Sequence, residues 1–384
     1  MASPGLLLPE TSTWGGGAVE DKAGLWHMFA AQIKAHCGLH SWGQNSEIVH
    51  ATAPAPDGPY QLVGTVLPTF SHGPAPTLLS DGRVVLGELG CGNETQPIVQ
   101  GCSNGTTPTT VAQATAPVTA KNFRPGGKSN CDWAHWKGVL VSSDAAGAPF
   151  SGKKWRQMAN WSGYGLVVRA GPDSWHNGDS NGSIVADNPS FWRFENGSFL
   201  LAYANKLKHP EGPGTPKWTG HKHVGLAVGE LPLDGGPLQP FTDIVSEPVF
   251  PWEAEDPDIW VDTTNNLTAW RWHMLAHRLV SNISTEVCAH AVAASPFGPW
   301  KVATIPAYTK DVEWVDDTGA ITTRTLQGRE RPRIIVDRTG TPVALSNGVN
   351  PGRAPTPVTP RGYAGDFSYT HVQMLDPVSP DSLP

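Results

Sequence analysis

The apolar residues of this chain lie in short runs that are separated by turns rich in Gly, Pro, Asn and Asp. The organising stretch is Glu255-Asp256-Pro257-Asp258-Ile259-Trp260, in which two acids and a proline precede an apolar strand. A turn and a second apolar run, Trp270 to His277, follow it. Short apolar runs bounded by turn residues are typical of β-strands. The stretch therefore predicts an antiparallel hairpin that opens with acidic residues and a proline.

The same plan recurs along the chain. Other copies begin at Trp14-Gly15-Gly16-Gly17, Ser71-His72-Gly73-Pro74, Asp187-Asn188-Pro189 and Glu330-Arg331-Pro332. Each copy is followed by a turn and a second apolar run. In the first four units, a strand of small residues comes next and ends in a Gly-Pro or Ala-Pro turn. Four antiparallel strands at a repeat of about 80 residues are typical of a propeller blade.

The repeat predicts the fold class, an all-β chain that forms a five-bladed β-propeller with four antiparallel strands per blade. We expect a single domain over residues 1–384. The blades are placed at about residues 12–68, 69–165, 183–250, 251–318 and 328–376. The composition agrees, because 42 Gly and 36 Pro supply many turns, and no amphipathic helix pattern is seen.

Charge and hydropathy argue against two classes of partner. The net charge is −7 and the chain has no basic cluster, so we expect no nucleic-acid partner. No run of about 18 apolar residues occurs, so we expect no membrane span.

Asn-x-Ser/Thr sequons are dense, and several fall in predicted turns where a glycan fits. They begin at Asn93, Asn104, Asn160, Asn181, Asn196, Asn266 and Asn282. The stretch from Met1 to Glu10 is too short, and lacks the basic start, for a signal peptide. We therefore expect the mature form of a secreted, extracellular glycoprotein that carries N-glycans. Composition bias in a chain rich in Gly, Ser and Thr is the alternative explanation of the sequons.

The chain has five cysteines, an odd number. Cys91 and Cys102 flank a loop and could pair, and so could Cys37 and Cys131. Cys288 lies in an apolar strand pattern and is predicted to be a buried free thiol. The sequence alone does not decide the connectivity.

The first strand of each propeller blade lines the central channel, so the residues that open these strands should gather at one mouth. They are His72, Asp187, Glu255 or Asp256, and Glu330 or Arg331. Carboxylates held close together raise one another's pKa, whereas Arg331 and Arg333 would lower it. Two carboxyl groups with separated pKa values can act as acid and base in the hydrolysis of a glycosidic bond. The alternative is that Asp, Asn and Pro before a strand are ordinary turn residues.

Other strands add candidates for binding. His277 ends a second strand and His290 lies in a third strand of the acidic unit. Trp14 could stack on a sugar ring, although packing between blades is the alternative for most tryptophans. No cofactor is predicted, and no HExxH or CxxC spacing supports a metal site. A structural cation in the central channel is left as a weaker alternative.

These motifs resemble the five-bladed β-propeller glycoside hydrolases of the arabinanase and β-xylosidase type. The blade rhythm carries the similarity over nearly the whole chain. It is strongest where Glu-Asp-Pro-Asp-Ile-Trp, the pair of His273 and His277, His290-Ala291 and Arg329-Glu330-Arg331-Pro332 stand in order.

The resemblance implies an aspartate base on the first blade, a second aspartate that tunes its pKa, and a glutamate acid on a later blade. Asp256 matches the family's Asp-Pro aspartate, Asp187 is a looser match, and Glu330 is the possible acid. The first blade departs from the pattern, because Trp14-Gly15-Gly16-Gly17 carries no carboxylate.

The first functional hypothesis is a secreted glycoside hydrolase that cleaves a poly- or oligosaccharide. Its catalytic residues would be Asp187, Asp256 and Glu330. The residues that would bind substrate are Trp14, His72, Glu255, His277, His290, Arg331 and Arg333. The second hypothesis is a non-catalytic propeller that binds carbohydrate, and the third is a protein-interaction propeller with a flat apolar face.

Overall fold

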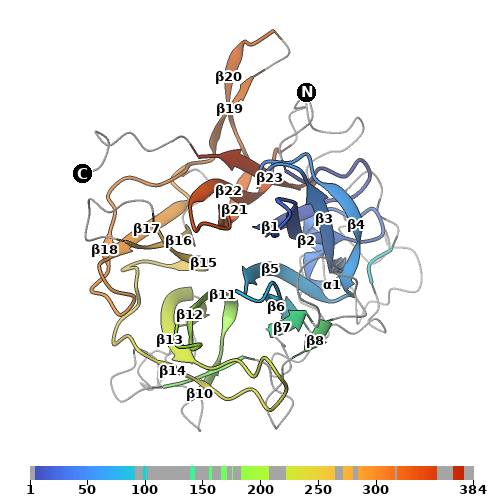
Figure 1. Ribbon diagram of the computed structural model, residues 1–384. Coiled ribbons are helices and arrows are strands. Elements are labelled where there is room, and N and C mark those ends of the chain that lie inside the picture. Colours follow the sequence, from blue (N-terminus) through green and yellow to red (C-terminus); the bar gives the residue numbers. More distant parts are fainter. Residues whose placement is uncertain are drawn as a thin grey trace, which may run out of the picture.

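The structure is a computed structural model whose described residues form β-strands and two short helical turns. It describes residues 5–90, 98–100, 102, 139–142, 155–157, 166–170, 175, 183–206, 222–263, 271–279, 284–315, 318–352 and 366–375. The sheets radiate around a common centre, as in a propeller (Figure 1). Within these ranges, no helix is long and apolar enough to cross a membrane.

Three sheets have the predicted four antiparallel strands. The first contains β1 (Thr13–Glu20), β2 (Trp26–Ile33), β3 (Ser46–Ala53) and β4 (Gln61–Leu67). Turns η1 (Leu39–Ser41) and α1 (Trp42–Asn45) lie between β2 and β3. The second contains β5 (Ser71–Leu78), β6 (Val84–Gly90), β7 (Val139–Ser142) and β8 (Trp155–Gln157). Another contains β15 (Ala254–Val261), β16 (Trp272–Arg278), β17 (Cys288–Ala293) and β18 (Lys301–Val302).

The remaining sheets differ from the predicted regular blade. One has six strands, in the order β10 (Ser183–Val185), β9 (Val167–Arg169), β14 (Phe241–Asp243), β13 (Lys222–Gly229), β12 (Phe199–Lys206) and β11 (Asp187–Arg193). The last has three, β21 (Gly328–Val336), β22 (Pro342–Asn350) and β23 (Tyr369–Met374). A separate hairpin, β19 (Asp311–Val315) with β20 (Ile321–Thr325), projects away from the ring (Figure 1). The all-β propeller is therefore confirmed, and three sheets have the predicted four strands, whereas the six-stranded and three-stranded sheets depart from that count among the described residues.

The first strands of the sheets contact one another in a closed ring. Strand β1 contacts β5, β5 contacts β11, β11 contacts β15, β15 contacts β21, and β21 contacts β1 again. Apolar residues fill the spaces between sheets, as where Phe191, Phe199 and Phe241 pack with Leu79 and Val85. Each such side chain contributes about 1.5–3 kcal/mol when it is fully buried.

Every one of these first strands contains the same bulge. One extra residue interrupts the register after Trp14, His72, Asp187, Glu255 and Glu330. The next residue has a left-handed backbone: φ is +60° at Gly15 and Gly73, +49° at Asn188, +54° at Asp256 and +52° at Arg331. Four of the five are followed by a proline, which has no N–H for the ladder and so suits an interruption. The recurring motif of the sequence is therefore a structural repeat.

The segment before β1 ties the ends of the ring together. Leu6 forms an antiparallel bridge with Thr370 of β23. The hydroxyl of Thr13 donates to the carbonyl of Leu6 at 2.9 Å and accepts from the amide of Thr370 at 2.9 Å. Thr13 and Thr370 are fully buried. The three-stranded last sheet is thus extended by residues from the beginning of the chain.

A disulfide joins Cys37 to Cys102, so both pairings considered from the sequence, Cys91 with Cys102 and Cys37 with Cys131, are wrong. Cys37 lies in the loop after β2, and the fold brings the segment after β6 beside it. Cys91 and Cys131 lie outside the described residues. Cys288 is a buried free thiol, as predicted.

Candidate functional site

The residue before each left-handed position forms what we call the rim. The rim residues are Trp14, His72, Asp187, Glu255 and Glu330. The sequence predicted that His72, Asp187, Glu255 or Asp256, and Glu330 or Arg331 open these strands, and it placed Trp14 at the start of the first unit. Three are carboxylates, and they come from the consecutive first strands β11, β15 and β21. The bulge places them beside one another although they are far apart in the chain.

A lysine bridges two of these carboxylates. The ammonium of Lys222, at the start of β13, lies 2.7 Å from Oδ2 of Asp187 and 2.6 Å from Oε2 of Glu255. Burial opposes the charge of Lys222, but the two carboxylates raise its pKa strongly, so it stays protonated. Sequence reasoning missed Lys222 as a site residue. Its only signal was a lysine at the start of a strand, and such lysines are usually solvated.

His277 lies directly across from Glu255. The two are register partners on β16 and β15, and Nδ1 of His277 is 3.8 Å from Oε1 of Glu255. Burial lowers the pKa of His277, but Glu330 and Glu255 outweigh it and raise the pKa to about 9. Burial likewise raises the pKa of Glu255, but Lys222 and His277 hold it well below its usual range. At neutral pH this pair is therefore an imidazolium beside a carboxylate.

A polar pocket of about 260 Å³ opens beside this pair. Glu255, His277, Leu279, Val287, Lys310, Gln327, Gly328, Arg329 and Glu330 line it. Arg329 is held by Asn347, Thr309 and Gln373, which fix its place in the wall. Two of the predicted carboxylates thus share a cavity with a protonated histidine.

The side chain of Arg331 lies at the centre of the ring, next to the rim residues. Its Nη1 lies 3.1 Å from Oδ1 of Asp256 and donates to Oδ1 of Asn188 at 3.3 Å. A side chain at Gly15 or Gly73 would collide with that of Arg331. The guanidinium therefore occupies the space at which all five left-handed positions converge.

Asp256 is accordingly not at the pocket surface, where its predicted catalytic role would require it. Its exposure is 1%, and the bulge turns it toward Arg331 while Glu255, one residue earlier, lines the pocket. Burial raises the pKa of Asp256 to about 6, although the charge of Arg331 acts in the opposite direction.

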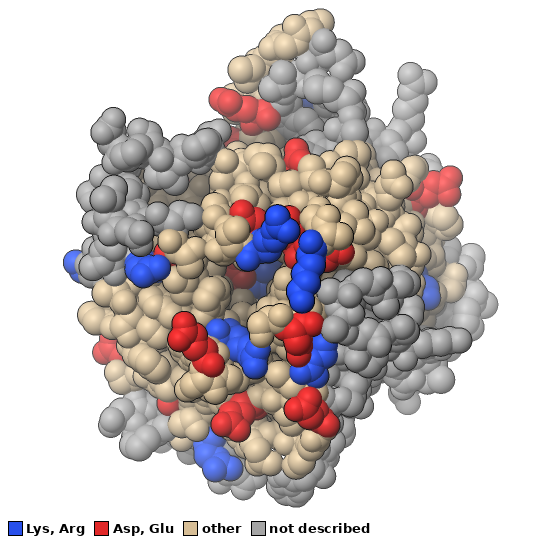
Figure 2. Space-filling view, viewed as in Figure 1, with Lys and Arg blue, Asp and Glu red and all other residues tan. Residues whose placement is uncertain are grey.

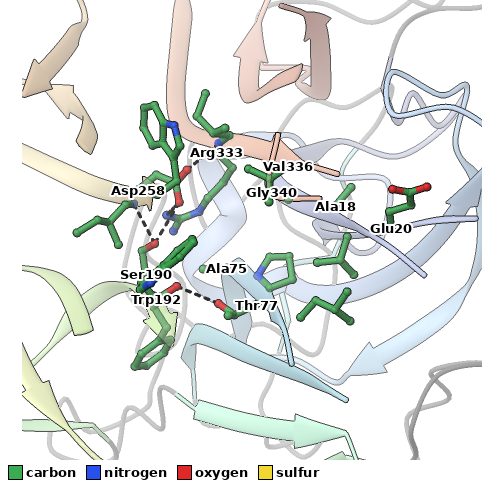
Figure 3. Close-up of a pocket in the computed structure, with 18 of the residues that line it drawn as sticks. Ala18, Glu20, Ala75, Thr77, Ser190, Trp192, Asp258, Arg333, Val336 and Gly340 are labelled. Carbon is green, nitrogen blue, oxygen red and sulfur yellow. Dashed lines mark hydrogen bonds and ion pairs between the residues drawn. The ribbon is translucent and has the colours of Figure 1, made fainter. Parts of the chain in front are cut away.

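A second charged layer lies further down the axis. Arg333 pairs with Asp258 at 3.2 Å, and Ser190 donates to the same carboxylate at 3.1 Å. Arg333 was expected to bind substrate, but it is 4% exposed and holds the sheets together. These residues line a second cavity of about 320 Å³, which also contains Thr77 and Trp192 (Figure 3).

Three other predicted residues lie away from the pocket. His72 is buried, hydrogen-bonds to Ser46 at 2.7 Å and packs against the ring of Trp42. His290 stacks on His273. Trp14 is 3% exposed and lies against the backbone of Gly348, so packing is its role in this structure.

A divalent cation does not fit the candidate donors. Glu255, Asp256 and His277 can bring one ligand atom each within 4.8 Å of one another. However, Lys222 contacts Glu255, Arg331 contacts Asp256, and His277 is itself protonated at neutral pH. Protein cations already neutralise this group, so we derive no step through a metal.

The surface near the centre of the ring is charged. Acidic and basic side chains gather around a hollow at the centre of one face (Figure 2). Charge of both signs in close proximity is consistent with the paired groups of the two axial layers.

No protein-family model matches the chain, and no curated protein matches it in sequence. Solved structures match its fold. A BT0996 RGII complex aligns with TM-score 0.53 and 11% identity, over 100% of this chain and 93% of the matched one. A protein described as a glycoside hydrolase aligns with TM-score 0.53 and 10% identity, over 100% and 93%.

Zg3597 is a family 117 glycoside hydrolase from the marine bacterium Zobellia galactanivorans. It aligns with TM-score 0.51 and 12% identity, over 95% of this chain and 84% of that chain. At such identities the similarity is one of fold. The chain shares its propeller fold with glycoside hydrolases, as its motifs implied.

Proposed function

We propose that this protein is a carbohydrate-active propeller that hydrolyses a glycosidic bond in the pocket of Glu255, His277 and Glu330. One observation supports this most strongly: two carboxylates from adjacent first strands line one polar cavity. Hydrolysis of a glycoside uses two carboxyl groups with different protonation states. The fold shared with glycoside hydrolases agrees with this assignment.

The proposed roles follow from the charges. Glu255 is held ionised and serves as the base that takes a proton from water. Glu330 raises the pKa of His277, so His277 is protonated at neutral pH and supplies its proton to the leaving oxygen. The bond between the anomeric carbon and that oxygen breaks, and the water oxygen bonds to the carbon. The proton on Glu255 then returns to His277.

Two predicted catalytic residues change roles in this proposal. Asp187 contacts Lys222, and Asp256 lies behind Arg331, so neither is proposed to touch substrate. Arg331 and Arg333 are likewise engaged with Asp256 and Asp258.

The second candidate function is carbohydrate binding without hydrolysis. It is favoured by a specific observation, that Trp14 occupies the rim position of β1, where a carboxylate would stand if all first strands contributed acids. The polar pocket counts against the protein-interaction propeller, because that hypothesis requires a flat apolar face.

The test is hydrolysis of a panel of aryl glycosides and natural polysaccharides by the wild type, Glu255→Gln and Glu330→Gln. Glu286→Gln is the matched control, because this glutamate is exposed and lies outside the pocket. We expect both pocket variants to lose activity by at least about 100-fold while their folding is retained. Full activity in both would overturn the proposal. Glycan binding without turnover by any variant or the wild type would establish the second candidate.

We further propose that the ring be counted as five blades, with the segment around Leu6 as the missing strand of the last blade. A secreted location is proposed from the disulfide, which is typical of oxidising compartments. Among the sequon asparagines, Asn196 is exposed in the turn between β11 and β12 and is a suitable glycan acceptor; the other six lie outside the described residues.

A further inference from the structure

Lys222 is the contact point between two neighbouring sheets at the pocket. It lies on β13 and reaches Asp187 of its own sheet and Glu255 of the next. Oδ1 of Asp187 has no hydrogen-bond partner among the described residues, so its contact with Lys222 is what holds this carboxylate. The position of Glu255 in the pocket wall therefore depends on a side chain from outside the pocket.

We propose that Lys222 is a positioning residue that fixes the carboxylate of Glu255 at the pocket wall, with Asp187 anchoring the ammonium from the other side. The inference rests on the proposed function of the same pocket. An ammonium that bridges two carboxylates at 2.6 and 2.7 Å forms short, charge-assisted hydrogen bonds, which restrict where Glu255 can lie.

The charges that face this contact come from four elements. They are Asp187 of β11, Glu255 and Asp256 of β15, His277 of β16, and Glu330 and Arg331 of β21. Burial raises the pKa of Glu255, but the charge of Lys222 and the hydrogen bond with His277 outweigh burial, so the pKa lies below its usual value. Without Lys222, burial and the charge of nearby Asp187 would favour the protonated form of Glu255.

The first readout is the pH dependence of kcat/KM in Lys222→Met and Lys222→Arg. For Lys222→Met we expect a loss of about 100-fold and a shift of the acidic limb to higher pH, because Glu255 is both displaced and protonated more easily. Lys222→Arg keeps a cation beside Glu255, so the acidic limb of its kcat/KM profile should lie at the same pH as in the wild type. Lys34→Met is the control, because Lys34 forms a similar pair with Glu47, 3.2 Å away, outside the pocket.

The second readout does not depend on hydrolysis. In the wild type, the folded pKa of Glu255 lies below its unfolded value, so its stabilisation is complete above that value and is lost as the pH falls. In Lys222→Met the folded pKa is raised instead, so the stability of the variant should fall as the pH rises from about 4 to 8. The midpoint of urea unfolding should therefore separate from that of the wild type with rising pH.

The outcomes separate the two proposals. A loss of stability in Lys222→Met that grows with pH and is absent from Lys222→Arg supports the positioning role. If Lys222→Met shows this loss of stability but the wild type hydrolyses no substrate, the proposed hydrolysis is rejected, whereas the positioning of Glu255 by Lys222 is retained. A pH dependence of unfolding in Lys222→Met equal to that of the wild type would overturn this inference, whatever the activity.

Discussion

At the residue scale, the axis depends on one arginine and the two glycines that make room for it. Arg331 adopts φ of +52°, and its side chain passes over Gly15 and Gly73. The same left-handed position thus carries a large side chain in one strand and no side chain in two others. This distribution packs the centre of the ring around a single guanidinium.

Gly73→Ala is predicted to destabilise the fold by on the order of 2 kcal/mol, because a left-handed backbone disfavours a Cβ and the new methyl collides with Arg331. The free energy of unfolding in urea is the measurement. Gly64→Ala is the control, since its Cβ would meet no atom within 4 Å and its φ is not left-handed. Equal stability of the two variants would show that Arg331 does not lie over Gly73.

His277 is predicted to make stability depend on pH above neutrality. Its pKa is raised in the folded state to about 9, so its stabilisation is complete below its unfolded pKa and is lost as the pH rises through 9. The loss should be on the order of 3 kcal/mol. Urea unfolding at several pH values from about 6 to 9.5 measures it. The free energy of unfolding of His277→Gln should change little with pH over this range. A wild type whose free energy of unfolding is equally independent of pH would contradict the prediction.

The sequence predicted the rim better than it predicted the roles of its members. A polar residue before a proline identified Asp187, Glu255 and Glu330 as neighbours, because the strand repeat is visible in the chain. It did not show which acid of the Glu255–Asp256 pair turns inward, since the φ of the bulge decides this. Lys222 was missed because its partners lie on two different sheets.

At the element scale, the last sheet is held to the first by hydrogen bonds around Thr13. The fully buried hydroxyl of Thr13 donates a hydrogen bond to the carbonyl of Leu6 and accepts one from the amide of Thr370. Strands were predictable here from alternation and turns. The use of Leu6 to extend β23 was not, because one bridge carries no periodic signal.

Thr13→Val is predicted to cost about 1–2 kcal/mol, because the isosteric side chain leaves the carbonyl of Leu6 without its hydroxyl donor. Thermal and urea unfolding are the measurements. Thr323→Val on the exposed strand β20 tests whether loss of a threonine hydroxyl alone has an effect. A cost no larger than that of Thr323→Val would mean that the tie between Leu6 and β23 contributes little.

At the scale of the whole molecule, the disulfide links the first sheet to the chain that follows the second. Cys37 and Cys102 are separated by 65 residues, which include strands β3 to β6. The sequence indicated that disulfides were possible but not which cysteines meet. The ring places the loops after β2 and β6 together, and that is a property of the fold rather than of local spacing.

Cys37→Ser/Cys102→Ser is predicted to lower the free energy of unfolding by about 4 kcal/mol, because the closed loop of 65 residues restricts the unfolded chain. Unfolding of the wild type with and without reductant should show the same difference. Among the described cysteines only Cys288 then remains, and it is free already, so the double variant should respond to reductant much less than the wild type. A reductant effect of similar size in the double variant would refute the assignment.

The bridge between Leu6 and Thr370 also bears on how the protein is made. A ribosome releases the beginning of the chain long before β23 exists, and at about 5–20 residues per second the wait is roughly 20 to 70 s. During that time β1 lacks its neighbour β21, and its apolar surface has no cover from the last sheet. Completion of the ring therefore waits until β23 has been synthesised, and until then the unfinished propeller exposes apolar surface and unpaired strand edges that favour aggregation.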